Sequence, residues 1–425
     1  MISIYTLTSP LHDKKAVEAA TAEFLWSLGI DYSLKGEDYS DYGSSDLDLI
    51  YVRTGGTEGV FKPLLPRITA ASSQPVYLLT SGVSNSLAAS MEILSYLRQK
   101  NLPGEIIHGS DDFVVKRITQ LAQVFRVKKS LSGFRIARVG KPSDWLISSD
   151  VDAKESKELN NIEIIDVTME EFFAEIARKE YKDNDYTELI KSKGYDAKEV
   201  EEALCIYGAL RRIVDKYELD GVTVRCFDLL DTVHSTGCSA LAILNAEGIY
   251  ASCEGDVPAL ISMTVLGELS GKPVFMANPS RINTDDNEII FAHCTLPINM
   301  PKDFEIMTHF ESQLGVAFRG KLQEGPATVF KCDGLMKKHF VSKAQLLENL
   351  CEYNLCRTQI RLKMGKPVTY FLTESIGNHH LIVEGDYSRI VDGRNPIIAH
   401  EFLGSDLEGK DVIIIDDMIS SGESM

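Results

Sequence analysis

Residues 248–280 read GIYASCEGDVPALISMTVLGELSGKPVFMANPS, a stretch that holds a complete strand–helix–strand pattern. Ile249–Cys253 is predicted as a strand, and Val274–Ala277 as the next strand. Gly271 ends the helix between them, because glycine readily adopts the left-handed conformation that closes a helix. This alternation is typical of a parallel sheet covered by helices.

The same alternation extends through the N-terminal part of the chain. Ile2–Thr6, Leu47–Val52 and Phe134–Val139 are predicted strands, and helices such as Ser86–Gln99 lie between them. Beyond about Pro297, short strands such as Val368–Leu372 follow one another around turns, which favours antiparallel pairing. We therefore predict an α/β fold with two Rossmann-like parallel-sheet domains, followed by a smaller, mainly antiparallel β domain.

The expected domain boundaries follow from changes in this pattern. A polar stretch near residues 148–161 separates an N-terminal α/β domain (1–150) from a second α/β domain (151–297) that carries the candidate metal-site residues. A C-terminal β-rich domain spans 298–386, and residues 387–425 form a tail of different character.

Composition restricts the class of partner. The 425 residues include 62 acidic and 44 basic side chains, a net charge of −18, so no basic face for nucleic acid or anionic lipid is expected. No apolar run approaches the roughly 18 residues of a membrane span, and the first residues lack the pattern of a signal peptide. We expect a cytoplasmic protein with no nucleic-acid or membrane partner.

Polar side chains follow the predicted strands of the second domain. Glu254, Asn278 and His293 each lie just past such a strand, and a Gly-Asn-His-His turn at 377–380 is expected between two later strands. A carboxylate, an amide oxygen and imidazoles suit a divalent cation such as Mn²⁺, Co²⁺ or Zn²⁺. Both residues also have an interpretation without a metal. Glu254 would then be a negative charge favoured by the dipole at a helix N-terminus, and His293 a hydrogen-bonded core histidine.

Several segments, in order, are similar to one known family. They are TVRCFDLL, CSALAILNAEGIYASCEGDVPAL, GKPVFMANPSRI, NEIIFAHCTLP, THFESQLGVAFRGKL and IGNHHLIVEGD, with RTGGTEG, SNSLAASMEILSYL and GKPSDWLISS nearer the N-terminus. Residues 1 to about 386 resemble the L-fucose isomerase and L-arabinose isomerase family, most closely its fucose-isomerase-like members. The resemblance implies conversion of an aldose into a ketose with a bound divalent metal, usually Mn²⁺, in a homo-oligomer whose subunits complete one another's sites.

The resemblance also implies roles for particular residues. Glu254 matches the first metal-binding carboxylate, which acts in proton transfer, and Asn278 stands where the family has a second metal-binding acid. His379 matches the metal-binding histidine, and His293 a further histidine at the metal. The positions that lie in similar sugar-contacting motifs are Arg225 and His309.

The departure at Asn278 leaves the function open, because an amide does not exchange a proton near neutral pH. The chain is interpreted as a metal-dependent aldose–ketose isomerase that acts on a fucose- or arabinose-like sugar through an ene-diol, with Asp256 as the nearest alternative second acid. It is alternatively a catalyst of a related step on an unusual sugar, or a catalytically silent carbohydrate-binding protein.

The tail from Tyr387 to Met425 resembles another family, the ribose-phosphate pyrophosphokinases. Its strand Val412–Ile415 runs into two aspartates and a small-residue turn. The residues of this ribose-phosphate-like loop are Asp416, Asp417, Ser421 and Gly422. Aspartates accept hydrogen bonds from ribose hydroxyls, and backbone N–H groups cradle a phosphate. Because nothing else of that fold is recognised, we interpret the tail as a foreign or truncated segment, such as a fusion with a pyrophosphokinase fragment.

Overall fold

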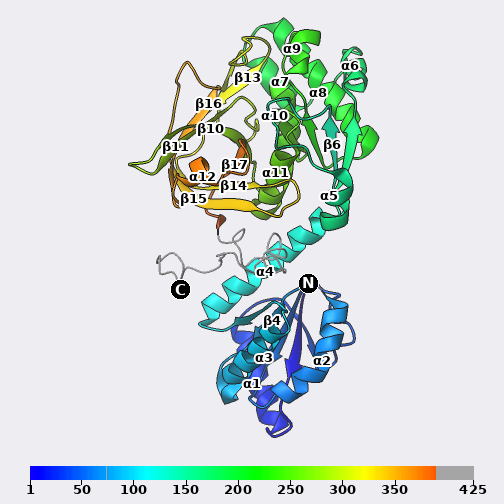
Figure 1. The fold of residues 1–425 in the computed structure, drawn as a ribbon, viewed down its shortest axis with the longest axis vertical. Coiled ribbons are helices and arrows are strands. Elements are labelled where there is room, and N and C mark those ends of the chain that lie inside the picture. The colour runs from blue at the N-terminus through cyan, green and yellow to red at the C-terminus, as the bar shows by residue number, and fades with distance from the viewer. Residues whose placement is uncertain (73, 389–425) are drawn as a thin grey trace. The chain divides into compact units, whose positions relative to one another are not determined.

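The computed structural model describes residues 1–72 and 74–388, and within them the chain forms two units (Figure 1). The first comprises residues 1–129, and the second begins at Ser130. The tail residues Asp416, Asp417, Ser421 and Gly422 lie outside the described residues.

The first unit is built on a five-stranded parallel sheet in the order β2-β1-β3-β4-β5. The strands are β1 (Ile2–Leu7), β2 (Ser33–Gly36), β3 (Leu47–Val52), β4 (Val76–Leu79) and β5 (Gly104–Ile107). The helices are α1 (Lys14–Ser27), α2 (Glu58–Ala71), α3 (Ser86–Gln99) and α4 (Asp111–Leu131), with a 3₁₀ turn at Val83–Asn85. Alternate residues of β3 enter separate cores on the two faces, Leu49 on one and Ile50 on the other, which explains its unbroken apolar sequence.

The second unit begins with a four-stranded parallel sheet in the order β7-β6-β8-β9. Its strands are β6 (Arg135–Val139), β7 (Glu163–Val167), β8 (Gly221–Val224) and β9 (Tyr250–Cys253). Its helices are α5 (Ala153–Asn160), α6 (Met169–Ile176), α7 (Asp185–Ser192), α8 (Ala197–Tyr217), α9 (Asp228–Thr232), α10 (Cys238–Ala246) and α11 (Val257–Ser270). Strand β6, which the sequence analysis grouped with residues 1–150, thus lies in this sheet.

A closed antiparallel barrel follows, in the order β10-β11-β16-β15-β14-β17. Its strands are β10 (Phe275–Asn283), β11 (Glu288–His293), β14 (Gly325–Cys332), β15 (His339–Asn349), β16 (Thr358–Met364) and β17 (His380–Glu384). A separate hairpin pairs β12 (Phe304–Met307) with β13 (Ala317–Gly320). Strands β10 and β11, expected within the second α/β domain, belong to the barrel.

Helix α11 joins the two layers of the second unit. It contacts β8 and β9 of the parallel sheet and β14 and β17 of the barrel, and Figure 1 shows α11 next to the labelled strands β14 and β17. Its sequence VPALISMTVLGELS is apolar on every side, as is typical of a helix buried all round. Because α11 starts at the end of β9, its first turn lies where the sheet meets the barrel.

The predicted fold class is confirmed, with two parallel sheets and a smaller antiparallel β domain. One local prediction is wrong. Residues 368–372 were expected as a strand, but the structure has the short helix α12 (Tyr370–Thr373), in which the N–H of Glu374 donates to the carbonyl of Tyr370 at 2.8 Å. The Gly-Asn-His-His segment therefore lies between α12 and β17. Among the described residues, no helix has the length and apolar character that crossing a bilayer requires.

Candidate metal centre

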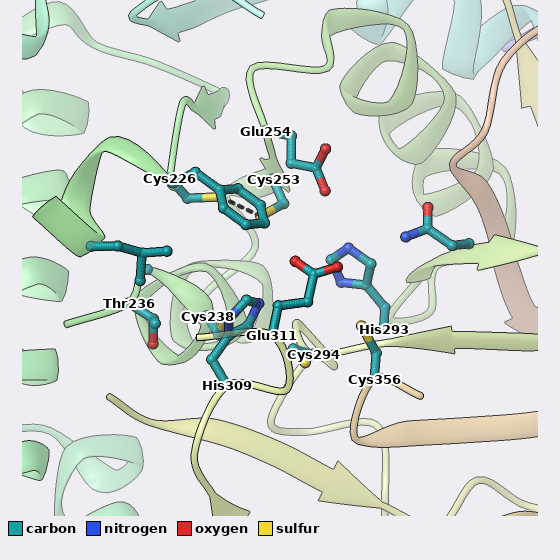
Figure 2. Close-up of a pocket in the computed structure, with 14 residues that line it drawn as sticks. Cys226, Thr236, Cys238, Cys253, Glu254, His293, Cys294, His309, Glu311 and Cys356 are labelled. Carbon is teal, nitrogen blue, oxygen red and sulfur yellow. Dashed lines mark hydrogen bonds between the residues drawn. The ribbon is translucent and has the colours of Figure 1, made fainter. Parts of the chain in front are cut away.

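Four of the expected residues converge where the parallel sheet meets the barrel. Glu254 follows β9, Asn278 lies in β10, His293 ends β11, and His379 immediately precedes β17. Glu254, His293 and His379 are buried, and each offers a ligand atom within 4.8 Å of the others. Asn278 lines the same cavity as Glu254 and His293. The close-up in Figure 2 shows the side chains of Glu254 and His293 facing one space.

The carboxylate of Glu254 is held in place by a strained turn. Glu254 has φ +64° and Gly255 has φ +72°, and the first of these is costly for a residue with a side chain. A Cβ at Gly255 would lie 2.6 Å from the carbonyl oxygen of Lys141, so this position requires glycine. Such strain is characteristic of functional sites. The turn directs the side chain into the cavity, where Oε2 accepts a 2.6 Å hydrogen bond from the indole N–H of Trp145.

His379 lies between two carboxylates. Its Nδ1–H donates to Oδ2 of Asp256 at 2.8 Å, while its Nε2 lies 3.4 Å from Oε1 of Glu254 without hydrogen-bond geometry. Burial lowers the pKa of His379, but the hydrogen bond with Asp256 and the negative charges of Asp256 and Glu254 outweigh burial and raise it. The two carboxylates thus favour positive charge at this point.

Asp256 lies behind the imidazole and outside the set of side chains that line the cavity. It is fully buried, and its Oδ1 caps α11 by accepting from the N–H of Ala259 at 2.9 Å. Its Oδ2 is also 3.6 Å from the buried ammonium of Lys331. Burial opposes ionisation, but the charge of Lys331 and the hydrogen bond of His379 hold the pKa of Asp256 well below its usual range. Asp256 therefore orients His379 and has no oxygen directed at the cavity.

The barrel contributes uncharged groups. The buried Oδ1 of Asn278 has no hydrogen-bond partner among the described residues. The hydroxyl of Thr295 lies 2.7 Å from Nδ1 of His293, and the N–H of Thr295 lies 3.2 Å from it. Burial and the nearby His379 lower the pKa of His293 to about 3, so its ring is neutral at physiological pH.

These residues fit a divalent cation. An amide oxygen and Nε2 of His379, neither with a hydrogen-bond partner in the described ranges, are buried beside an anionic carboxylate. Each buried polar group without a partner is costly unless something binds it. Carboxylate, amide and imidazole donors suit borderline divalent metals such as Mn²⁺.

An aromatic wall and a group of thiols complete the cavity. The ring of Phe227 makes edge contacts with Trp145 at 4.9 Å and with His309 at 5.7 Å between centroids. The thiols that line the cavity are those of Cys226, Cys238, Cys253, Cys294 and Cys356, none of them in a disulfide. Glu311 is the other acidic side chain that lines this cavity besides Glu254.

The two residues expected to contact sugar differ in position. His309 lines the cavity, whereas Arg225 lies outside its lining. The guanidinium of Arg225 pairs with Asp144 at 3.1 Å and donates to the carbonyl oxygen of Pro142 at 2.6 Å. Arg225 therefore supports the loop that carries Trp145.

The sequence interpretation did not single out Trp145 or Glu311. Both lie in segments that carry the family resemblance, GKPSDWLISS and THFESQLGVAFRGKL. The family resemblance of these segments was therefore visible in the sequence, but neither a tryptophan nor a glutamate indicates a metal site by itself.

Comparison with known proteins finds similarity to enzymes named as sugar isomerases. Sulfoquinovose isomerases from Priestia aryabhattai and from Priestia megaterium are each 24% identical to this chain over 260 residues. A sulfoquinovose isomerase from a Clostridium species is 31% identical over 99 residues, which are 23% of this chain and 22% of that protein. The Priestia alignments span 58% of this chain and 58% of each relative, so less than two thirds of the relatives' length is covered. No family model matches the chain.

Proposed function

We propose that this protein is a metal-dependent aldose–ketose isomerase that acts on a sugar through an ene-diol. The observation that carries the proposal is the buried group of Glu254, His293 and His379. Glu254 and His293 line one cavity with Asn278, whose Oδ1 has no hydrogen-bond partner among the described residues. The resemblance to sugar isomerases in sequence supports the same chemistry.

Glu254 is the proposed base of the reaction. It takes a proton from the carbon next to the sugar carbonyl and returns that proton to the neighbouring carbon, a role worth about 10²–10⁴-fold in rate. The indole N–H of Trp145 stabilises the ionised form and, with His379, lowers the pKa of Glu254 despite its burial. A bound Mn²⁺ or another divalent cation, held by Glu254, His379, His293 and Asn278, would polarise the adjacent sugar oxygens.

The substrate class follows from the comparisons and from the resemblance together. We propose a fucose- or arabinose-like monosaccharide or sulfoquinovose, the sugar in the names of the relatives. A homo-oligomer is part of the same proposal, and light scattering of the purified protein would measure its mass.

The experiment is a turnover assay with a sugar panel. Purified protein is stripped with EDTA, reloaded with Mn²⁺ and mixed with L-fucose, L-arabinose or sulfoquinovose, and ketose formation is followed by NMR. We expect one sugar to be converted, and EDTA to abolish that conversion. Binding of Mn²⁺ without conversion of any aldose or ketose in an extended panel would refute the isomerase.

A carbohydrate-binding protein without activity is the second candidate. The amide at Asn278, where the resembled family has an acid, favours it. Under this alternative, calorimetry detects sugar binding that depends on Mn²⁺, while NMR detects no product and no exchange of the carbon-bound hydrogen with D₂O.

A further inference from the structure

The proposed reaction needs two kinds of proton transfer, and the residues assigned so far provide one. Glu254 moves the proton between carbons. A second proton must reach the carbonyl oxygen, and one must leave the neighbouring hydroxyl. The amide of Asn278 cannot exchange protons in this way, and both oxygens of Asp256 are engaged behind His379.

Glu311 has the position that this second transfer requires. It lines the cavity together with Glu254, Asn278 and His293. Figure 2 shows its carboxylate directed toward the interior of the group, between the ring of His309 and the side of His293 and Glu254. Within the described part of the chain, no hydrogen bond or ion pair engages this carboxylate, so both of its oxygens are free to contact a ligand.

The backbone holds Glu311 firmly. It lies at the tip of the β12–β13 hairpin, where the N–H of His309 donates to the carbonyl of Leu314 at 2.9 Å and the N–H of Gln313 donates to the carbonyl of His309 at 3.0 Å. The hydroxyl of Ser312 lies 3.0 Å from Nδ1 of His309. This bonded turn fixes the point from which the Glu311 side chain reaches the cavity.

The surroundings also favour proton exchange by Glu311. Partial burial, and next the negative charge of Glu254, raise its pKa above the ordinary glutamate value. A carboxyl group with a raised pKa holds its proton more readily, so it can give a proton at one stage and accept one at the next.

We propose that Glu311 is the second proton-transfer group of this cavity and carries protons to and from the two neighbouring sugar oxygens. The inference rests on the proposed isomerase function. As Glu254 takes the carbon-bound proton, the C–H electron pair forms the C=C bond, and the carbonyl π pair takes the proton of Glu311. The Glu311 carboxylate then removes the proton of the other hydroxyl, whose electron pair forms the new C=O bond. The C=C pair recovers the proton from Glu254, so no external oxidant or reductant is needed.

The test compares Glu311→Gln with a matched control on the same hairpin. Glu305→Gln serves as the control, because Glu305 lies on β12 and pairs with Arg319 outside the cavity lining. For Glu311→Gln we expect kcat to fall at least about 100-fold, with Mn²⁺ affinity and thermal unfolding unchanged. Glu311→Asp should regain part of kcat, and Glu305→Gln should keep all of it.

The outcomes separate this inference from the function on which it rests. Wild-type protein that converts no sugar overturns the isomerase and this inference together. An active wild type with an equally active Glu311→Gln overturns the role of Glu311 alone. A folded Glu311→Gln that no longer binds Mn²⁺ would make Glu311 a metal ligand and also overturn the proposed role.

Discussion

The parallel sheet and the barrel of the second unit contribute opposite kinds of group to the site. The end of β9 supplies negative charge on a strained turn, with Glu254 at φ +64°. The barrel supplies an amide and imidazoles on or beside strands of a closed hydrogen-bonded ladder, such as Asn278 in β10 and His293 in β11. A loop can therefore hold a strained residue such as Glu254, while the closed barrel fixes the directions of the amide and imidazole groups that would bind the metal.

Two carboxylates on the same turn show how environment separates their roles. Glu254 and Asp256 are two residues apart, yet only Glu254 lines the cavity. Asp256 is enclosed by His379, Lys331 and the first turn of α11. Chain proximity therefore does not make them a catalytic pair.

The largest effect is expected from removing the charge that the sheet contributes. Glu254→Gln deletes the anionic donor and the proposed base, so we expect a rate loss of at least about 10³-fold and weaker Mn²⁺ binding in calorimetry. Glu324→Gln, at an exposed position, is the control. An unchanged rate would show that the base of the reaction lies on the barrel side, and that the parallel sheet does not supply the essential charge.

The next effect concerns the residue behind His379. Asp256→Asn leaves the buried ammonium of Lys331 without its carboxylate, which should destabilise the protein by about 3–5 kcal/mol in urea unfolding. The double variant Asp256→Asn with Lys331→Met should recover most of that stability. Its Mn²⁺ affinity should stay about 10–100-fold below wild type, because His379 lacks its charged partner. Full recovery of affinity would show that Asp256 only neutralises Lys331.

A smaller effect is expected at Trp145. Trp145→Phe keeps an aromatic ring beside Phe227 but removes the N–H that donates to Glu254 at 2.6 Å. We expect kcat to fall about 10-fold, since loss of a supporting hydrogen bond at a metal site typically costs 10–100-fold. Trp26→Phe, at an exposed position in the first unit, should leave kcat unchanged.

The smallest expected effect is on the pH dependence of folding stability, which should differ between a histidine of the barrel and an aspartate beside the parallel sheet. Burial lowers the pKa of His380 in the barrel to about 3, against about 6.5 in an unfolded chain. The unfolded state therefore binds more protons below pH 6.5, and this contribution to stability falls by up to about 1.4 kcal/mol per pH unit as the pH drops further. The depressed pKa of Asp256 acts in a lower pH window, because its contribution to stability is lost only as the pH falls below about 3.8.

Urea unfolding of wild type and His380→Leu at pH 7.5, 6 and 5 checks this order. Leucine retains contact with Phe371, whose ring centroid is 4.9 Å from that of His380. The stability of wild type should decrease more steeply with falling pH than that of the variant. Parallel curves would show that His380 does not cause the acid sensitivity.

The sequence by itself was sufficient for the periodic parts of the fold. The strand–helix–strand pattern around residues 248–280 and the short strands after Pro297 predicted two parallel sheets and an antiparallel β domain, because side-chain periodicity is local information. The strand predicted at residues 368–372 was wrong, because a short apolar run does not distinguish a strand from a helical turn.

Which residues line the same cavity depends on tertiary packing, and the sequence pattern does not reveal it. Glu254 was expected at a sheet edge together with Asn278 and His293, yet only Glu254 follows a parallel strand, and the other two are brought to it by the barrel. That Asp256 supports His379, that Arg225 supports a loop and that Glu311 reaches the cavity depend on contacts between segments far apart in the chain. Such contacts leave no periodic trace in sequence, because they arise from the packing of whole layers against α11.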